Sequence, residues 1–131
     1  MPTVTDPIVS ESVVVDSSGW LEYLTSDVKA DLFEPYLREP FLFVPTIVLY
    51  EVRKILLLRH TKVAADHFVS LALQHTVVPV DTVIALSAAA ISIQHKLAMA
   101  DALVYTTAEK LGAKLVTSDS NFSELPGVTL L

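Results

Sequence analysis

The stretch "SVVVD" (residues 12–16) joins a run of β-branched apolar residues to an acidic residue at its end. An uninterrupted apolar run is typical of a strand in a parallel sheet that is covered on both faces, because a strand with one face in water alternates apolar and polar residues. The next residues, "SSGWLEYL" (17–24), predict a helix with Asp16 or a serine as its N-cap. A buried strand followed directly by a helix is the repeating unit of α/β folds.

Similar strand and helix patterns continue to the end of the chain. Further strands are predicted at residues 41–45, 76–80 and 114–119 ("KLVTSD"), with a short fifth strand at 128–131. Further helices are predicted between Pro35 and Pro40, at 47–60 with Thr46 as N-cap, at 62–75, from Asp81 or Thr82 to Gln94, and at 99–111 before a left-handed Gly112. We therefore expect an α/β fold, a three-layer α/β/α sandwich around a mainly parallel sheet of four to five strands.

The length and composition restrict the class of protein. A chain of 131 residues is long enough for one domain with its own core, so we expect a single domain at 1–131. The sequence contains no cysteine, which excludes disulfides, thiolate metal sites and cysteine nucleophiles. No apolar run reaches the roughly 18 residues of a membrane span, and residues 1–10 lack the basic start of a signal peptide. We expect a cytoplasmic protein that does not enter a membrane.

The charge of the chain argues against nonspecific binding to nucleic acids. Fifteen acidic and nine basic residues give a net charge of −6. Four basic residues nevertheless lie within ten positions, namely Arg53, Lys54, Arg59 and Lys62. A solvated helix face and a contact surface for RNA explain this local basic segment equally well.

Four acidic residues occupy positions that point to one site. Asp16 and Asp119 follow predicted strands, and open parallel sheets bind ligands at the carboxyl edge of their strands. Glu51 lies in the second turn of the helix that leaves the second strand, so we expect it at the same edge. Asp101 is assigned there only because it is a charge in the first turn of an otherwise apolar helix. Each acid alone is explained equally well as a helix cap or as a partner of the helix dipole.

Four carboxylates at one edge would require a cation, because they repel one another and cannot all remain ionised without one. A cluster of oxygen ligands without cysteine selects a hard divalent ion such as Mg²⁺ or Mn²⁺. Such an ion activates water and neutralises charge on a phosphoryl oxygen. The chemistry that these residues favour is metal-assisted hydrolysis of phosphodiester bonds.

Other sites and other families fit the sequence less well. Ser17 and Ser18 lack a histidine partner at a suggestive position and are better explained as capping residues. A phosphoacceptor receiver domain would need paired acids after the first strand, and a haloacid-dehalogenase-type phosphatase would need an aspartate where Ser18 stands. The histidines lack the paired spacing of a zinc site, which applies to His60, His67, His75 and His95. A noncatalytic interaction module with the same fold remains an alternative.

Four segments in this order resemble the PIN-domain ribonucleases, and most closely the VapC-like toxins of toxin–antitoxin pairs. The segments are "VVVDSSGWLEYL" (13–24), "VPTIVLYEVRKIL" (44–56), "LAMADALVYTTAEKLGAKLVTSD" (97–119) and "NFSELPGV" (121–128). The resemblance implies a homodimeric endoribonuclease that depends on Mg²⁺ or Mn²⁺ and is blocked by a cognate antitoxin protein. It also implies an acidic quartet that binds the metal, consisting of Asp16, Glu51, Asp101 and Asp119.

The resemblance assigns supporting roles to residues around the quartet. Ser17 and Thr117 occupy the positions of hydroxyl residues that the family often carries beside its first and last aspartates. Asn121 stands where many relatives have a further aspartate, which weakens the case for a second metal ion. Arg53, Lys54 and Lys96 are the candidates for contact with RNA. An exposed apolar stripe on "VIALSAAAISI" (83–93) would fit dimerisation or docking of the antitoxin.

Overall fold

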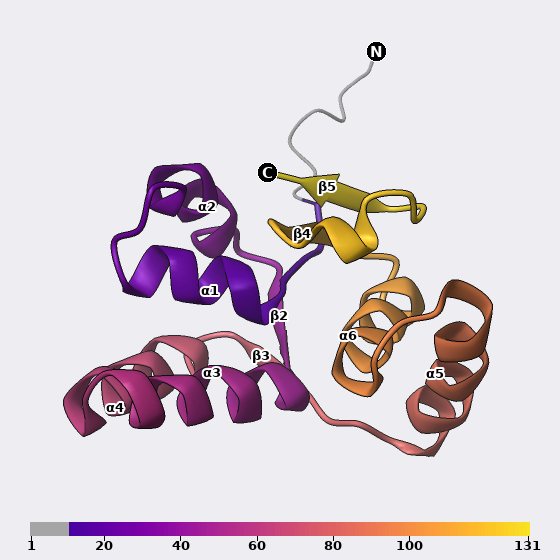
Figure 1. The fold of residues 1–131 in the computed structure, drawn as a ribbon, viewed down its shortest axis with the longest axis horizontal. Helices are drawn as coiled ribbons and strands as arrows, with labels where there is room; N and C mark the ends of the chain where they lie inside the picture. The colour runs from indigo at the N-terminus through magenta and orange to yellow at the C-terminus, as the bar shows by residue number, and fades with distance from the viewer. Residues whose placement is uncertain (1–10) are drawn as a thin grey trace, which may run out of the picture.

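Residues 11–131 are described by a computed structural model, in which helices pack around a parallel sheet (Figure 1). Within these residues the sheet has five strands in the order β3-β2-β1-β4-β5, and every pairing is parallel. The strands are β1 (Val13–Val15), β2 (Leu42–Pro45), β3 (Thr76–Val78), β4 (Lys114–Thr117) and β5 (Val128–Leu130). The predicted three-layer α/β/α sandwich is confirmed, and its sheet is parallel throughout this part of the chain.

In the described part of the chain, two helices follow each of the first three strands. These helices are α1 (Ser17–Leu24), α2 (Ala30–Leu37), α3 (Thr46–Arg59), α4 (Lys62–Ala72), α5 (Thr82–His95) and α6 (Met99–Lys110). A short 3₁₀ helix, η2 (Ser120–Phe122), lies between β4 and β5. The helices within each pair are packed against each other, as Figure 1 shows for α3 with α4 and for α5 with α6.

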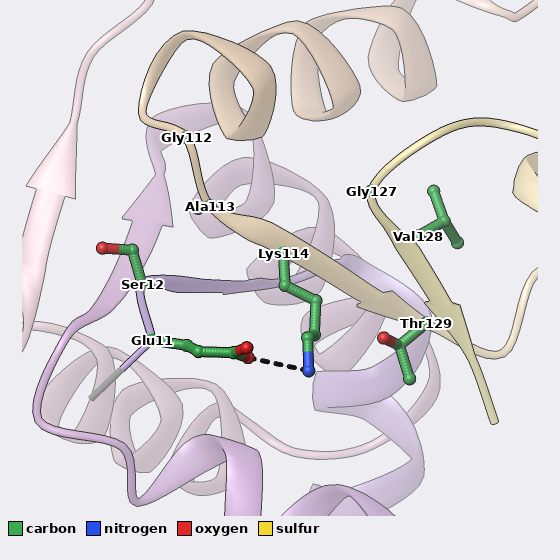
Figure 2. A pocket seen from close by; sticks show the side chains of 8 residues that line it. All are labelled: Glu11, Ser12, Gly112, Ala113, Lys114, Gly127, Val128 and Thr129. Carbon is green, nitrogen blue, oxygen red and sulfur yellow. Dashed lines mark ion pairs between the residues drawn. The ribbon is translucent and has the colours of Figure 1, made fainter. Parts of the chain in front are cut away.

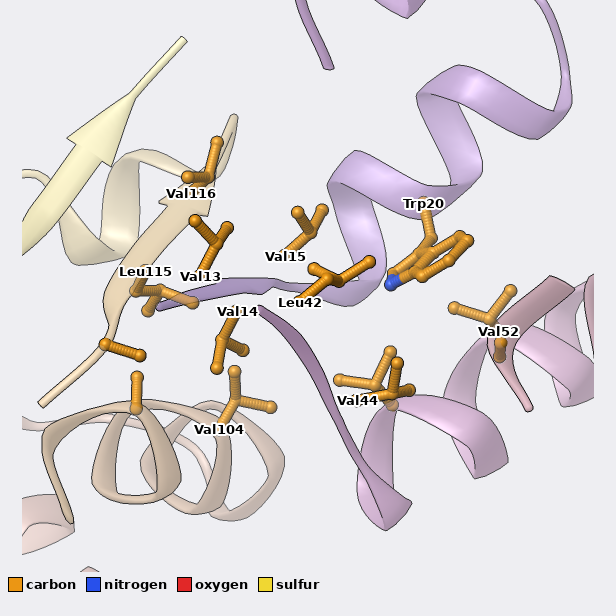
Figure 3. Close-up of a cluster of buried hydrophobic side chains, with 14 of the residues drawn as sticks. Val13, Val14, Val15, Trp20, Leu42, Val44, Val52, Val104, Leu115 and Val116 are labelled. Carbon is orange, nitrogen blue, oxygen red and sulfur yellow. The ribbon is translucent and has the colours of Figure 1, made fainter. Parts of the chain in front are cut away.

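The central strand β1 lies inside the core, as its uninterrupted apolar sequence predicts. Val13, Val14 and Val15 are at most 1% exposed, so both faces of the strand are covered. Val14 points towards Val104 of α6, whereas Trp20 of α1 lies beside Leu42 of β2 (Figure 3). The hydrophobic core therefore joins helices from different parts of the chain to the same strand.

Two helix ends determine where strands and helices meet at the sheet. Gly112 has a φ of 63° after α6, and the Ala113 amide donates to the Ala108 carbonyl at 2.8 Å. This arrangement is a Schellman motif, which confirms the predicted left-handed glycine and directs the chain into β4. Asp81, rather than Thr82, is the N-cap of α5, since its Oδ1 accepts from the Ile84 amide at 2.8 Å.

Some predicted boundaries were wrong. Pro35 lies within α2 instead of preceding a helix, so this helix lacks the hydrogen bond that an amide at position 35 would donate to the Asp31 carbonyl. Thr46 is the first residue of α3, and the N-cap is Pro45, which has no side-chain donor or acceptor for capping. Helix α4 ends at Ala72 and strand β3 at Val78, both earlier than predicted.

Among residues 11–131, no single helix has both the length and the apolar character needed to cross a bilayer. Helices α5 and α6 satisfy these criteria only when taken together, and the chain bends by 114° between them.

Gly19 permits the close approach of α1 to the core. A Cβ atom at this position would lie 2.6 Å from both Phe33 Cε1 and Val15 Cγ1. Both atoms belong to side chains that are fully buried, so neither has free space into which to move. A side chain at position 19 would therefore separate α1 from β1 and α2.

We expect Gly19→Ala to lower the free energy of unfolding by about 1–3 kcal/mol, the usual effect of overpacking a core. Urea unfolding followed by circular dichroism measures this change. Ser70→Ala, an exposed change on α4, is the control and should alter stability by less than about 0.5 kcal/mol. Equal midpoints for Gly19→Ala and the wild type would show that Phe33 and Val15 move aside freely.

Candidate functional site

The first two acidic residues lie together where the neighbouring strands β1 and β4 end. Asp16 follows β1, and its amide donates to the Val116 carbonyl at 3.2 Å, which continues the pairing of the two strands. Thr117, the last residue of β4, is completely buried and donates through Oγ1 to Asp16 Oδ2 at 2.7 Å. Thr117 Oγ1 in turn accepts from the Asp119 amide at 2.9 Å. The Thr117 hydroxyl therefore connects Asp16 with the backbone of Asp119.

Asp16 is a buried carboxylate that also begins the helix α1. Its Oδ1 accepts from the Gly19 amide at 3.1 Å, the N-cap bond, and from Ser18 Oγ at 2.8 Å. Burial raises the pKa of the Asp16 carboxyl above its ordinary value, and the bonds from Thr117, Ser18 and Gly19 oppose this increase. The nearby charge of Asp119 adds a smaller increase. Hydrogen bonds thus partly replace the solvation that Asp16 loses through burial.

Glu51 is brought to this edge by α3. Ser17 of α1 donates through Oγ to Glu51 Oε1 at 2.5 Å, which joins the first turn of α1 to α3. Ser17 was predicted to be a supporting residue next to the first aspartate, and in the structure its hydroxyl contacts Glu51. Its hydrogen bond fixes one oxygen of Glu51 relative to Asp16.

Asp101 lies in the first turn of α6 and is close enough to the other three acids to be affected by their charges. Burial raises the pKa of its carboxyl, and repulsion from Asp119, Glu51 and Asp16 raises it further, to about 6. The structure therefore brings Asp101 to the edge at which its charge led us to expect it. The other three predicted acids therefore all lie within electrostatic reach of Asp101.

No basic side chain of residues 11–131 forms an ion pair with any of these four acids. Nor do these residues contain a group of three or more acidic or histidine side chains already arranged to hold a metal ion. The carboxylates are neighbours without forming a closed set of ligands. Their oxygen donors and their mutual repulsion nevertheless fit a hard divalent cation better than a soft metal.

The other predicted site residues differ in how they relate to the acids. Asn121 is exposed on η2, and its backbone amide, rather than its side chain, donates to Asp119 Oδ1 at 2.9 Å. Arg53 is bound to Asp66 at 3.0 Å. Lys54 lies over the ring of Tyr50, with Nζ 5.6 Å from the ring centroid. Lys96 is exposed at the end of α5 with a φ of 56°.

Two serines that were not predicted to belong to the site are in contact with it. Ser18 Oγ donates to Asp16, and Ser118 Oγ donates to Ser18 Oγ at 3.2 Å. These serines are 100 residues apart in the chain, so no local pattern connects them. The only local signal was the position of each serine next to or near a predicted acidic ligand.

A cavity of about 400 Å³ lies at the opposite edge of the sheet (Figure 2). Its lining includes Ser12, Gly112 and Gly127, which precede β1, β4 and β5. Lys114 and Glu11 form an ion pair there at 2.8 Å. Because parallel strands end at the other edge, this cavity is separate from the acids.

We expect Asp101→Asn to stabilise the protein at pH 7, in EDTA, and to have little effect at pH 4. The folded pKa of about 6 exceeds the ordinary value of 3.8, so the folded state binds the proton more tightly and stability falls as the pH rises between these values. Because Asp101 is half exposed, solvent screening limits the expected gain to about 1 kcal/mol. Urea unfolding at both pH values measures it.

Asp31→Asn, an exposed change in the first turn of α2, is the matched control. It removes a charge that favours the helix dipole, so it should lower stability at pH 7 by at most about 0.3–1 kcal/mol rather than raise it. If Asp101→Asn gave the same gain at pH 4 as at pH 7, the cause would not be the charge of the carboxylate.

Comparisons with known proteins show which solved structures resemble this chain. Three of those that share the fold illustrate the similarity. A toxin–antitoxin complex from Klebsiella pneumoniae aligns with a TM-score of 0.78 and 19% identity, over 90% of this chain and 96% of the other. VapC20 from Mycobacterium tuberculosis, described as a sarcin–ricin loop cleaving toxin, aligns with a TM-score of 0.76 and 20% identity. The alignment covers 89% of this chain and 97% of VapC20. VapBC2 from Rickettsia felis, bound to a promoter DNA fragment, aligns with a TM-score of 0.70 and 14% identity. The alignment covers 91% of this chain and 96% of the matched chain.

At these identities the structural similarity shows the fold alone. No curated protein matches the chain by sequence. The family model described as the PIN domain, however, matches residues 13–128, which include β1, the four acids and the start of β5. The chain therefore belongs to the PIN domain family.

Proposed function

We propose that this chain is a metal-dependent endoribonuclease that hydrolyses RNA phosphodiester bonds and is the toxin of a toxin–antitoxin pair. One observation carries the proposal. Four carboxylates from separate segments, those of Asp16, Glu51, Asp101 and Asp119, meet at one edge of a parallel sheet, and burial together with repulsion from the other three raises the pKa of Asp101 to about 6. In a structural network, such acids would be expected to have basic partners, and residues 11–131 provide none as ion pairs.

Mg²⁺ or Mn²⁺ is the cofactor that this donor set favours. Asp16, Glu51, Asp101 and Asp119 would hold the ion, which when bound supplies an activated water and neutralises charge on the phosphate. The chain's own contribution is to position these oxygens. Thr117 orients Asp16, and the Ser17 hydroxyl restrains Glu51. Asn121 contributes no charge, so we propose a site with fewer acidic ligands than relatives that have an aspartate there.

The choice of RNA as substrate has two kinds of support. VapC20, which is similar in fold, is described as a sarcin–ricin loop cleaving toxin, and exposed cations lie on the same helix as Glu51. Lys54 is the best candidate for contact with a phosphate, because Arg53 is already paired with Asp66. Lys96 is a second candidate, since it lies five residues before Asp101 and is exposed. We propose that these cations offset the overall negative charge near the site.

An antitoxin protein and a second copy of the chain are the proposed partners. Several similar structures are toxin–antitoxin complexes, which supports an antitoxin for this chain as well. An arginine of the antitoxin could neutralise the acidic site directly. Exposed apolar side chains on α5, namely Val83, Leu86 and Ile93, would suit a protein interface such as that of a homodimer. We propose that residues 1–131 act as one domain in the cytoplasm.

We expect the purified chain, freed of any antitoxin, to cleave total cellular RNA with Mg²⁺ or Mn²⁺ and not with EDTA. Asp101→Asn should reduce the rate by at least about 100-fold, because it removes one charged ligand without changing the size of the side chain. Gel electrophoresis and sequencing of the fragments measure the rate and identify the RNA. Asp31→Asn serves as the control and should cleave normally.

The alternative is a PIN-fold module that binds a partner without catalysis. Absence of cleavage by the correctly folded, partner-free wild type would contradict the nuclease proposal and favour this module. Equal cleavage by the wild type and Asp101→Asn would attribute the activity to a contaminating nuclease.

A further inference from the structure

The Asp16 carboxylate is restrained at both of its oxygens by different parts of the chain. Oδ1 accepts from Ser18 Oγ at 2.8 Å and from the Gly19 amide at 3.1 Å. Oδ2 accepts from Thr117 Oγ1 at 2.7 Å. Since Asp16 is only 5% exposed, these bonds rather than water determine how the carboxylate is oriented.

The number of lone pairs shows which oxygen remains available. An ionised carboxylate has about four lone-pair positions, two on each oxygen. Among the donors that residues 11–131 supply, two occupy Oδ1 and one occupies Oδ2. One lone pair of Oδ2 is therefore left for another ligand, and Oδ1 has none.

The Ser18 hydroxyl donates one hydrogen bond and accepts another, so its hydrogen points towards Asp16. A serine hydroxyl has one hydrogen to donate, and Ser18 donates it to Asp16. Ser118 Oγ donates to Ser18 Oγ at 3.2 Å, and the Ser118 amide approaches the same oxygen at 3.4 Å. A chain of hydrogen bonds thus runs from Ser118 through Ser18 to Asp16 Oδ1. It links the residue after β4 to the first turn of α1.

We propose that Ser18, held by Ser118, is a positioning residue that saturates Asp16 Oδ1 and thereby directs one lone pair of Oδ2 to the cation. The inference rests on the proposed function, since it concerns how the proposed site binds its metal. Asp16 would then bind the ion through a single oxygen. Without the Ser18 hydroxyl, one lone pair of Oδ1 becomes available, and Oδ1 and Oδ2 compete for the ion.

The test measures Mn²⁺ binding by calorimetry, without RNA, for the wild type and its variants. Ser18→Ala should weaken binding about tenfold, in the range typical of groups that orient metal ligands. Ser18→Thr keeps the hydroxyl and should bind nearly as the wild type does. Ser118→Ala leaves the Ser18–Asp16 bond in place and should have a smaller effect than Ser18→Ala.

A second readout separates positioning from general damage to the fold. Ser12→Ala removes a half-buried hydroxyl at the other end of β1 and should leave Mn²⁺ affinity unchanged. In RNA cleavage, Ser18→Ala should need about tenfold more Mn²⁺ for half-maximal rate, and saturating Mn²⁺ should restore most of the wild-type kcat. Circular dichroism in EDTA verifies that each variant is folded.

The possible results distinguish this inference from the proposed function. If Asp101→Asn loses Mn²⁺ affinity and Ser18→Ala does not, the positioning role is wrong and the metal site stands. If the wild type and Asp101→Asn bind Mn²⁺ equally, the proposed metal site is wrong, and the inference falls with it.

Discussion

A buried carboxylate at the end of the central strand is the constraint on which the rest of this structure depends. Asp16 leaves the core strand β1 and enters α1, so its surroundings must satisfy both a strand end and a helix start. Thr117 reaches it from β4, and the Gly19 amide reaches it from the first turn of α1. Removing any of these donors would leave a charge with reduced solvation in the protein interior.

The pairing of β1 with β4 is what brings distant acids together. Because the strands are parallel and adjacent, Asp16 and Asp119 emerge at the same edge although they are far apart in sequence. Glu51 and Asp101 are carried there on helices, and repulsion from the other acids contributes to the raised pKa of Asp101. Such a concentration of like charge reduces stability and is typical of sites selected for function.

Much of the fold could be predicted because the apolar runs are uninterrupted. Val13, Val14 and Val15 predicted a strand covered on both faces, and Gly112 predicted the end of α6. The order of the strands could not be predicted, because it depends on pairings between distant residues. Thr46 and Pro35 misled the prediction of helix boundaries because side-chain preferences are weak compared with tertiary packing.

The candidate site was predictable in its acids and less so in its supporting groups. Asp16 and Asp119 could be located because they follow predicted strands, and open parallel sheets bind ligands at the carboxyl edge of their strands. Asp101 was assigned from its charge alone, and only the packing of α6 brought it near the others. Ser18 and Ser118 were missed because their hydrogen bond joins residues 100 positions apart. The metal, the RNA substrate and the antitoxin remain proposals that go beyond membership of the PIN domain family.

The most direct test of these proposals is X-ray diffraction at the manganese absorption edge from crystals grown with Mn²⁺. We expect an anomalous peak next to Oδ2 of Asp16, with carboxylate oxygens of Glu51, Asp101 and Asp119 around it. Ordered crystals without a peak at this edge of the sheet would contradict a metal site formed by these acids. A peak only at other surface carboxylates would contradict it equally.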